Sequence, residues 1–323
     1  MSTAYADAAN LPVSAPTPIV SYSPLVLDVP SRPVPLELKV SMPATGTNLP
    51  VILFAHGHGQ STFISSLRGY GPLVDFWAAH GFVVIQPTHL DSTVLGLRTK
   101  KLPDAPLFWR SRAEDMHFIL DHLEEIEAAV PGLAGRLDHS RIAAAGHSLG
   151  GHTVGLLLGM QMLVPNDSRP KDLADARIKA GVLMGAPGVA DDHFAAWASE
   201  HYPALKYSNF DQMKSTALVV AGDKDLNPYF SARLSYRWDA YTRSPAGNKT
   251  LLTMLGGAEH MLGGISGYDC KETTDENPAR VATLRALVWA YLRSQLYPGD
   301  RSWDDAVAAL QENDTPIAKI ESR

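Results

Sequence analysis

The chain has 323 residues, of which 45% are hydrophobic and 19% are charged, and its net charge is −6. This composition supports a large buried core and excludes a chain that is disordered throughout. A mildly acidic chain without a basic run is not expected to bind nucleic acid. The single cysteine, Cys270, excludes an intrachain disulfide and a multi-cysteine zinc site.

The N-terminal sequence favours a protein of a reducing compartment. Residues 1–17 are rich in Ala, Pro and Ser, and we expect a loose arm there, followed by one domain over residues 18–323. The arm lacks the basic and continuous apolar regions of a signal peptide, although a signal removed beforehand would leave no trace. No apolar run approaches the roughly 20 residues of a membrane helix. We therefore expect a cytoplasmic protein without a membrane span.

Short apolar strands alternate with helical patterns along the rest of the chain. Strand patterns occur at residues 35–42, 51–55, 82–86, 141–145, 180–184, 217–221 and 250–255. Helical patterns occur at residues 112–129, 149–162, 192–199, 229–241, 279–296 and, capped by Ser302, 302–311. The first strand alternates apolar and polar residues, as a strand near a sheet edge does, whereas the others are largely apolar, as in buried parallel strands. The pattern predicts an α/β fold with a mostly parallel central sheet and helices on both faces.

A G-x-S-x-G motif, GHSLG at residues 146–150, lies between an expected strand and an expected helix. A serine at such a sharp turn has a strained backbone and an exposed hydroxyl, and the glycines avoid clashes with the neighbouring strand and helix. The helix N-terminus behind the serine favours developing negative charge. A glycine-rich turn that merely lets a helix pack closely is the alternative. The strand and helix around the motif favour Ser148 as a nucleophile.

The sequence GHSLGG after a strand resembles the α/β-hydrolase superfamily, in which serine, acid and histidine follow in that order. The resemblance extends over about residues 35–297 and implies the α/β-hydrolase fold without a large cap domain. It implies that Asp225, in the G-x-x-D turn after Gly222, is the acid, with Asp223 as the competitor. It also implies that His260, in the loop after the next strand, is the general base. Such a triad needs no cofactor and no metal.

The resemblance further implies an oxyanion hole formed by the backbone N–H groups of His58 and Leu149. His58 belongs to the turn HGHGQS that follows the strand at residues 51–55. A metal pair of His56 and His58 is the alternative, but no third ligand with a suitable spacing is evident. Other polar residues near these motifs are expected to be structural, namely Arg112, Asp115, His147 and His152.

Apolar residues flank these loops, whereas no cluster of Arg or Lys does. The expected substrate-binding residues are Phe63, Ile64, Leu226 and Met261. They favour a neutral, fairly apolar ester, either a small molecule or a polymer. Residues 185–215 contain several aromatic side chains, and we expect them to form a lid, one wall of an acyl pocket, or a helix whose apolar face joins the core.

The wider pattern is similar to chlorophyllase-like, platelet-activating-factor-acetylhydrolase-like and polyester-hydrolase-like esterases. Leu149 stands where chlorophyllases usually carry a basic residue, and Cys270 lies after the expected base, so it does not match the cysteine nucleophile of dienelactone hydrolases. Chlorophyll and cyclic acidic lactones are therefore not expected as substrates.

We expect a serine carboxylic-ester hydrolase. The alternative is an acyltransferase or perhydrolase with the same triad, which differs in the nucleophile that reaches the acyl-enzyme. A catalytically inactive binding protein is disfavoured because all three triad residues are present. The sequence leaves the oligomeric state open.

Overall fold

The computed structural model describes residues 11–169, 171–256, 277–312 and 317–323. Within these residues, nine strands form one sheet in the order β1-β2-β4-β3-β5-β7-β9-β10-β11, and β6 pairs with β8 apart from it. The strands from β4 to β10 along this order run parallel, whereas β1, β2 and β11 pair antiparallel with their neighbours. The mostly parallel sheet predicted from the sequence is confirmed.

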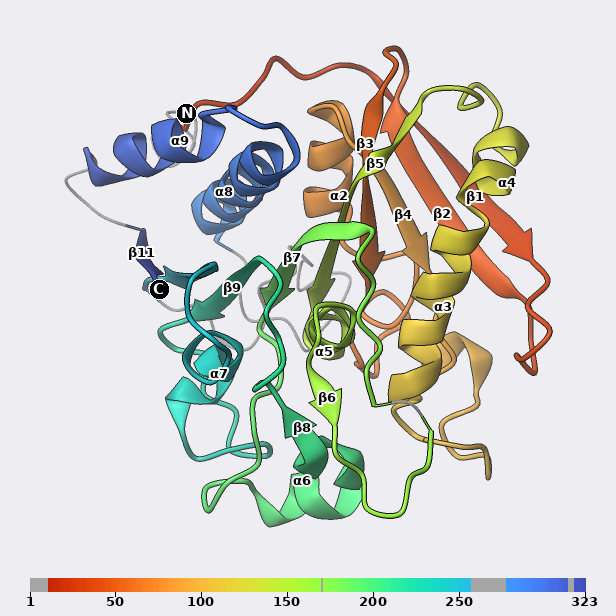
Figure 1. Ribbon diagram of the computed structural model, residues 1–323, viewed down its shortest axis with the longest axis vertical. Coiled ribbons are helices and arrows are strands. Elements are labelled where there is room, and N and C mark those ends of the chain that lie inside the picture. Colours follow the sequence, from red (N-terminus) through yellow and green to blue (C-terminus); the bar gives the residue numbers. More distant parts are fainter. Residues whose placement is uncertain (1–10, 170, 257–276, 313–316) are drawn as a thin grey trace.

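The bounds of the elements follow the chain in Figure 1. The strands are β1 Ile19–Leu27, β2 Leu36–Pro43, β3 Leu49–Ala55, β4 Val83–Pro87, β5 Leu137–His147, β6 Gln161–Met162, β7 Ile178–Met184, β8 Ser208–Asn209, β9 Ala217–Gly222, β10 Lys249–Met254 and β11 Ala318–Ser322. The α-helices are α2 Gly71–Ala79, α3 Trp109–Asp121, α4 Leu123–Ala129, α5 Leu149–Leu157, α6 Ala196–His201, α7 Asp239–Thr242, α8 Pro278–Leu296 and α9 Ser302–Gln311. Short 3-10 helices are η1 Thr93–Leu95, η2 Pro203–Tyr207 and η3 Leu234–Trp238.

The sheet separates two hydrophobic clusters, one on each face. Successive side chains of β3 alternate between them, with Val51 and Leu53 in the first cluster and Ile52 and Phe54 in the second. Helices α3, α4 and α5 contribute to the first cluster, and α2, α8 and α9 to the second. In Figure 1, α3 and α5 lie in front of the sheet. Because β3, β5, β7, β9 and β10 are parallel, the loops that follow them meet at one edge of the sheet.

The sequence patterns did not predict the two outermost strands. Most residues of β1 are exposed, and Pro24 lies where its pairing register with β2 shifts, so this strand has neither alternation nor an apolar run. The sequence of β11, AKIES, is short and largely polar. Since β1 covers the flank of β2, the strand expected near an edge is buried along most of its length.

Five helix predictions need correction. The helix expected at residues 192–199 begins only at Ala196, in α6, and the stretch expected as a helix at residues 229–241 contains η3 and the short α7 instead. The helix expected at residues 112–129 is divided at His122 into α3 and α4. The helix expected at residues 149–162 ends at Leu157, after which Gly159, with φ +105°, turns the chain into β6. In α9, Ser302 is the first helical residue rather than the cap, and its N–H donates to Asp300 Oδ1 at 2.8 Å.

The described part of the expected N-terminal arm contacts the domain. Leu11 is buried in the second cluster, and the Thr17 N–H donates to the Ala79 carbonyl at 2.8 Å. No helix in the described ranges is long and apolar enough to span a bilayer.

Glu127 of α4 fastens the turn that leads into β5. Its Oε1 accepts from the N–H groups of Arg136 and Leu137 at 2.6 and 2.9 Å, and its Oε2 lies 2.8 Å from His139 Nε2. Burial raises the pKa of Glu127, but these hydrogen bonds outweigh burial and hold the pKa below its usual value. The carboxylate is therefore more stable in the folded chain than in the unfolded one.

We expect Glu127→Ala to lower the free energy of unfolding by about 2 kcal/mol at pH 7, because it leaves two backbone N–H groups without this acceptor. A lowered pKa in the folded state stabilises the protein above the unfolded pKa, and the contribution is lost as the pH falls through the folded value. The deficit should thus shrink in urea titrations once the pH falls below about 4.3, the pKa of an unfolded glutamate. Glu125→Ala, an exposed change on the same helix, is the control, and an equal loss in both variants would contradict this role.

Candidate active site

Ser148 occupies a strained turn between β5 and α5. Its φ of 53° and ψ of −119° are costly for a residue other than glycine. The Ser148 N–H donates to the Met184 carbonyl of β7 at 2.8 Å, which fastens the turn to the neighbouring strand. Leu149, directly after it, begins α5, so its N–H is one of the first four of the helix, which have no acceptor within it. Strand, turn and helix thus have the arrangement that the GHSLG motif predicts.

Two glycines allow the turn to pack against β3. A Cβ on Gly150 would lie 2.0 Å from the Ala55 carbonyl oxygen, and one on Gly146 would lie 2.3 Å from the Gly150 backbone. Both contacts involve main chain that cannot move aside. The glycines of the motif are therefore required by close packing, and the packing places the serine at the end of β3.

Tyr70 holds the loop after β3 through hydrogen bonds. The Gly57 N–H donates to Tyr70 Oη at 2.9 Å, and the Tyr70 hydroxyl donates to the Ile64 carbonyl at 3.1 Å. The same hydroxyl lies 3.0 Å from His147 Nδ1. Because the hydroxyl proton goes to Ile64, His147 carries its proton on Nδ1 and donates it to Tyr70. The residue before the candidate nucleophile thus helps to hold this loop.

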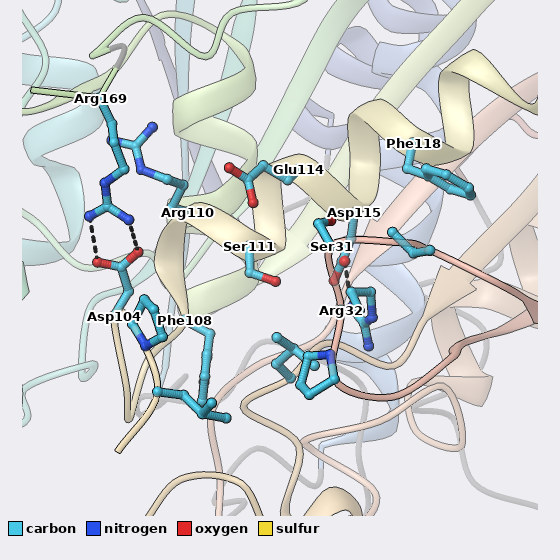
Figure 2. A pocket seen from close by; sticks show the side chains of 15 residues that line it. Ser31, Arg32, Asp104, Phe108, Arg110, Ser111, Glu114, Asp115, Phe118 and Arg169 are labelled. Atoms are coloured by element: carbon cyan, nitrogen blue, oxygen red, sulfur yellow. Dashed lines mark hydrogen bonds and ion pairs between the residues drawn. The ribbon is translucent and has the colours of Figure 1, made fainter. Parts of the chain in front are cut away.

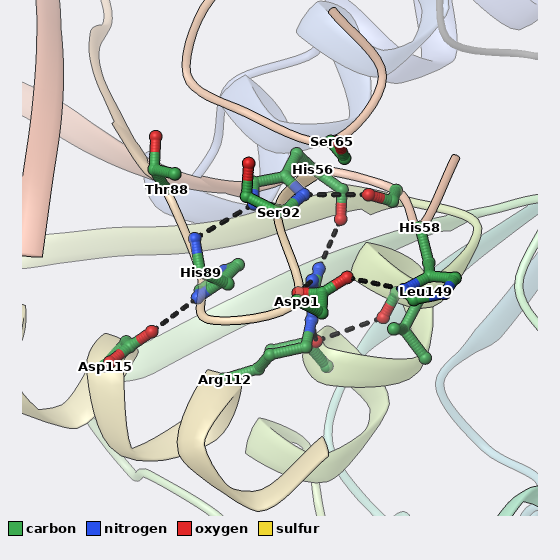
Figure 3. Close-up of polar contacts among 12 residues, drawn as sticks. His56, His58, Ser65, Thr88, His89, Asp91, Ser92, Arg112, Asp115 and Leu149 are labelled. Carbon is green, nitrogen blue, oxygen red and sulfur yellow. Dashed lines mark hydrogen bonds and ion pairs between the residues drawn. The ribbon is translucent and has the colours of Figure 1, made fainter. Parts of the chain in front are cut away.

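A buried arginine joins the loop after β3 to the loop after β4 and to α5. Arg112 of α3 contacts the Asp91 carboxylate and the His56 carbonyl through its two terminal nitrogens, and its Nε donates to Thr153 Oγ1 at 2.8 Å (Figure 3). The Thr153 hydroxyl donates in turn to the Leu149 carbonyl at 3.0 Å. One guanidinium therefore bonds to three segments around the candidate site.

Asp91 connects this arginine to His58. Its Oδ2 lies 2.8 Å from His58 Nδ1, and both side chains are buried. Burial raises the pKa of Asp91, but Arg112 and His58 outweigh it and hold that pKa well below its usual value. Burial lowers the pKa of His58, so the ring is neutral with its proton on Nδ1. The side chain of the expected oxyanion residue is thus fixed by a carboxylate.

His56 has no lone pair left for a metal. Its Nε2 accepts from the His89 N–H at 3.0 Å, so its proton is on Nδ1, which donates to the Gly57 carbonyl at 2.8 Å. Burial and the nearby Arg112 hold the pKa of His56 well below its usual value. In the described part of the chain, no group of three His, Cys, Asp or Glu residues is arranged to hold a metal ion.

Asp225 and Asp223 lie on the loop after β9. The Asp225 carboxylate is buried, and Arg237 Nε lies 3.3 Å from its Oδ1. Asp223 is only half-buried, and its N–H continues the pairing of β9 with β10 through the Met254 carbonyl. The buried position suits an acid that orients a histidine. His260 and Met261 lie outside the described residues.

An apolar cluster lies against the start of α5. Leu149 packs with Leu107 and Leu205, and partly buried aromatic rings cover them, among them Phe194, Tyr202 and Phe230. The Tyr202 ring lies 5.3 Å from the His58 ring and stacks on Phe230 at 5.8 Å. We call Phe194, Tyr202 and Phe230 the aromatic wall. Two of its members come from residues 185–215, whereas Phe210 of that segment joins the core.

The expected substrate-binding residues differ in exposure. Phe63 is 37% exposed and Leu226 is 46% exposed. Ile64 is buried in the second cluster, so it supports the loop after β3 from within rather than presenting a surface. Trp197 and Tyr229, which contact each other at 5.5 Å, add exposed aromatic area beside the wall. Tyr229, Phe230 and Arg237 come from the segment after Asp225, where the sequence indicated only a helix.

A cavity of about 490 Å³ lies elsewhere, between α3, the β1–β2 connection and the loop that precedes α3 (Figure 2). Its arginines face carboxylates: Arg32 contacts Asp115, and Arg169 binds Asp104 through two hydrogen bonds of 2.8 and 2.9 Å. Neither Ser148 nor Asp225 lines it. The cavity therefore says nothing about the chemistry of the serine.

The fold and the strained strand-to-helix turn at Ser148 together define a protein of the α/β-hydrolase class. A family model described as "Alpha/beta hydrolase family" matches residues 52–318, most of the chain. The chain belongs to the alpha/beta hydrolase family. No curated protein matches the chain. Membership supports the predicted hydrolase class and leaves the substrate open.

We expect Gly150→Ala to destabilise the protein by more than about 3 kcal/mol or to prevent folding, because overpacking against main chain cannot relax. Gly155→Ala is the matched control on α5, since its Cβ would meet only side chains, Met160 at 3.3 Å and Leu183 at 3.5 Å. Thermal melting of both variants checks this. Similar melting temperatures would show that the turn is not closely packed on β3.

Proposed function

We propose that the protein is a serine carboxylic-ester hydrolase with Ser148 as nucleophile, His260 as general base and Asp225 as the acid. The observation that carries the proposal is the positive φ of Ser148 at a strand-to-helix turn, where the family has its nucleophile. The burial of the Asp225 carboxylate after β9 supports its role as the triad acid. The role of His260 rests on its place after β10 and on the order of the family's triad.

The reaction proceeds through an acyl-enzyme. Ser148 Oγ attacks the ester carbonyl carbon while His260 takes the hydroxyl proton. The tetrahedral oxyanion collapses, the bond to the alcohol oxygen breaks, and the alcohol leaves with the proton that His260 returns. A water molecule then attacks the acyl-enzyme while His260 again accepts a proton. The bond between the acyl carbon and Ser148 Oγ breaks, His260 returns the proton to Oγ, and the carboxylic acid leaves.

The N–H groups of His58 and Leu149 serve as the oxyanion hole. The His58 ring is fixed by Asp91, and the Leu149 carbonyl is bonded by Thr153, so both residues are held before substrate arrives. Preorganised donors of this kind are typically worth roughly 3–4 kcal/mol each in the transition state. The N-terminus of α5 adds favourable potential at the same place.

The substrate is a neutral, fairly apolar ester, small or polymeric. The aromatic wall lies beside the predicted oxyanion residue His58, and Phe63 and Leu226 are exposed after β3 and β9. Of the arginines around the site, Arg112 is engaged with Asp91 and Arg237 with Asp225, whereas Arg98 binds the Gly59 and Asp91 main-chain carbonyls.

We expect Ser148→Ala to lower kcat for p-nitrophenyl esters on the order of 10⁶-fold, because triad members act as a unit. The fold should persist, since alanine keeps the backbone turn, and circular dichroism checks this. Ser140→Ala, an exposed change on β5, should stay within about twofold of the wild type. Activity of Ser148→Ala within tenfold of the wild type would refute the proposal.

We expect Asp225→Asn to reduce kcat by roughly 10⁴-fold, because an amide in place of the carboxylate favours the wrong tautomer of the catalytic histidine. Asp223→Asn should change kcat by less than about threefold, since that side chain is half-buried and its backbone continues the pairing of β9 with β10. Steady-state kinetics of the two variants decide between them. The reverse ranking would move the acid to Asp223.

A further inference from the structure

Arg237 contacts the loop that carries Asp225. It belongs to η3 and is only 5% exposed. Its Nη1 donates to the Gly185 carbonyl at 2.9 Å, and its Nε lies 3.3 Å from Asp225 Oδ1. One side chain thus connects the carboxyl end of β7 with the residue proposed as the triad acid.

Arg237 connects two segments of irregular main chain, one directly after β7 and one after β9. Gly185 has a φ of +56°, and its N–H donates to the Val220 carbonyl at 2.8 Å. A Cβ on Gly185 would lie 3.4 Å from Asp225 Oδ2, so β7 borders one carboxylate oxygen and Arg237 borders the other. Asp225 follows the last residue of β9 by three positions, and a turn hydrogen bond of 3.3 Å from its N–H to the Gly222 carbonyl sets its backbone. Side-chain contacts therefore have to fix the carboxylate.

The two arginines that flank η3 and α7 are engaged with other carboxylates. Arg233 binds Asp239 at 2.8 Å and Asp191 at 2.9 Å. Arg243 lies 3.6 and 3.7 Å from the same two carboxylates. On the loop of the acid itself, Lys224 is exposed and Asp223 is half-buried. Among the described residues, Arg237 is the cation that pairs with Asp225.

We propose that Arg237 is a positioning residue for the triad: it holds the Asp225 carboxylate in place and, as a fixed cation beside it, limits how strongly that carboxylate attracts the proton of the catalytic histidine. This inference rests on the proposed function. It adds a fourth side chain to the Ser148, His260 and Asp225 set, one that acts through Asp225 without touching substrate.

The electrostatic consequence has a definite sign. A triad carboxylate stabilises the protonated imidazole, and a guanidinium that shares the carboxylate weakens this effect and also repels the imidazolium. The histidine then loses its proton at a lower pH than it would beside an unshared carboxylate. Because only the neutral imidazole accepts the serine proton, Arg237 extends activity toward mildly acidic pH.

The test is the pH profile of kcat/KM for a p-nitrophenyl ester. In Arg237→Gln, which removes the cation, the acid limb should move to higher pH by about one unit. Activity at pH 6 should then fall several-fold more than activity at pH 8. In Arg237→Lys, which keeps the charge but lacks the fork that reaches both partners, the limb should stay near that of the wild type while kcat falls about tenfold.

Arg243→Gln removes one positive charge from the neighbouring helix, and its acid limb should stay where it is. A folded Arg237→Gln whose limb is unmoved would overturn the inference, as would an Arg237→Lys whose limb moves by a full unit. The lysine variant decides the matter alone if the glutamine variant does not fold. Ser148→Ala separates a failure of this inference from a failure of the proposed function. If Ser148→Ala keeps activity within tenfold of the wild type, the ester-hydrolase proposal is refuted, whatever the Arg237 variants do.

Discussion

The arrangement of the loops around the candidate site depends on one buried charge, the guanidinium of Arg112. Arg112 is fully buried, and a buried guanidinium that loses its partner typically costs about 3–5 kcal/mol, so its contacts with Asp91 and the His56 carbonyl are obligatory for the fold. Those partners belong to the loops after β3 and β4, and a third contact reaches Thr153 of α5. The requirement to satisfy one cation therefore fixes, in a single arrangement, the segments from which the proposed oxyanion hole is built.

The same logic recurs on the other side of the serine. Arg237 bonds the end of β7 and faces Asp225 after β9, just as Arg112 bonds the end of β3 and faces Asp91 after β4. In both cases a buried cation pairs with a carboxylate on a loop and holds a main-chain carbonyl of the adjacent strand. Each carbonyl belongs to the first residue after a strand, His56 after β3 and Gly185 after β7, and each arginine binds that carbonyl while it contacts an acid.

The sequence could predict what local pattern determines. Apolar runs indicated the central strands, and the glycines of GHSLG predicted the strained turn, because such packing allows no other residue. Edge strands such as β1 carry no such signal, since solvent accepts almost any side chain there. The pairs Asp91 with His58 and Arg237 with Asp225 join residues that are distant along the chain or lie on irregular segments, so only the folded arrangement of the strands brings them together.

Tyr202 links the aromatic wall to the loop that carries His58. Its ring is part of the aromatic wall through Phe230, and it also rests edge-on against the ring of His58. The surface that would select the size of a substrate is thus continuous with the loop that would stabilise its transition state. A smaller residue in place of this tyrosine would widen the site for bulkier esters but would also loosen the loop. A wider range of substrates would therefore come with a lower turnover rate. Phe194, a member of the wall whose ring lies against Tyr236 rather than His58, offers a route to new selectivity that leaves the oxyanion loop supported.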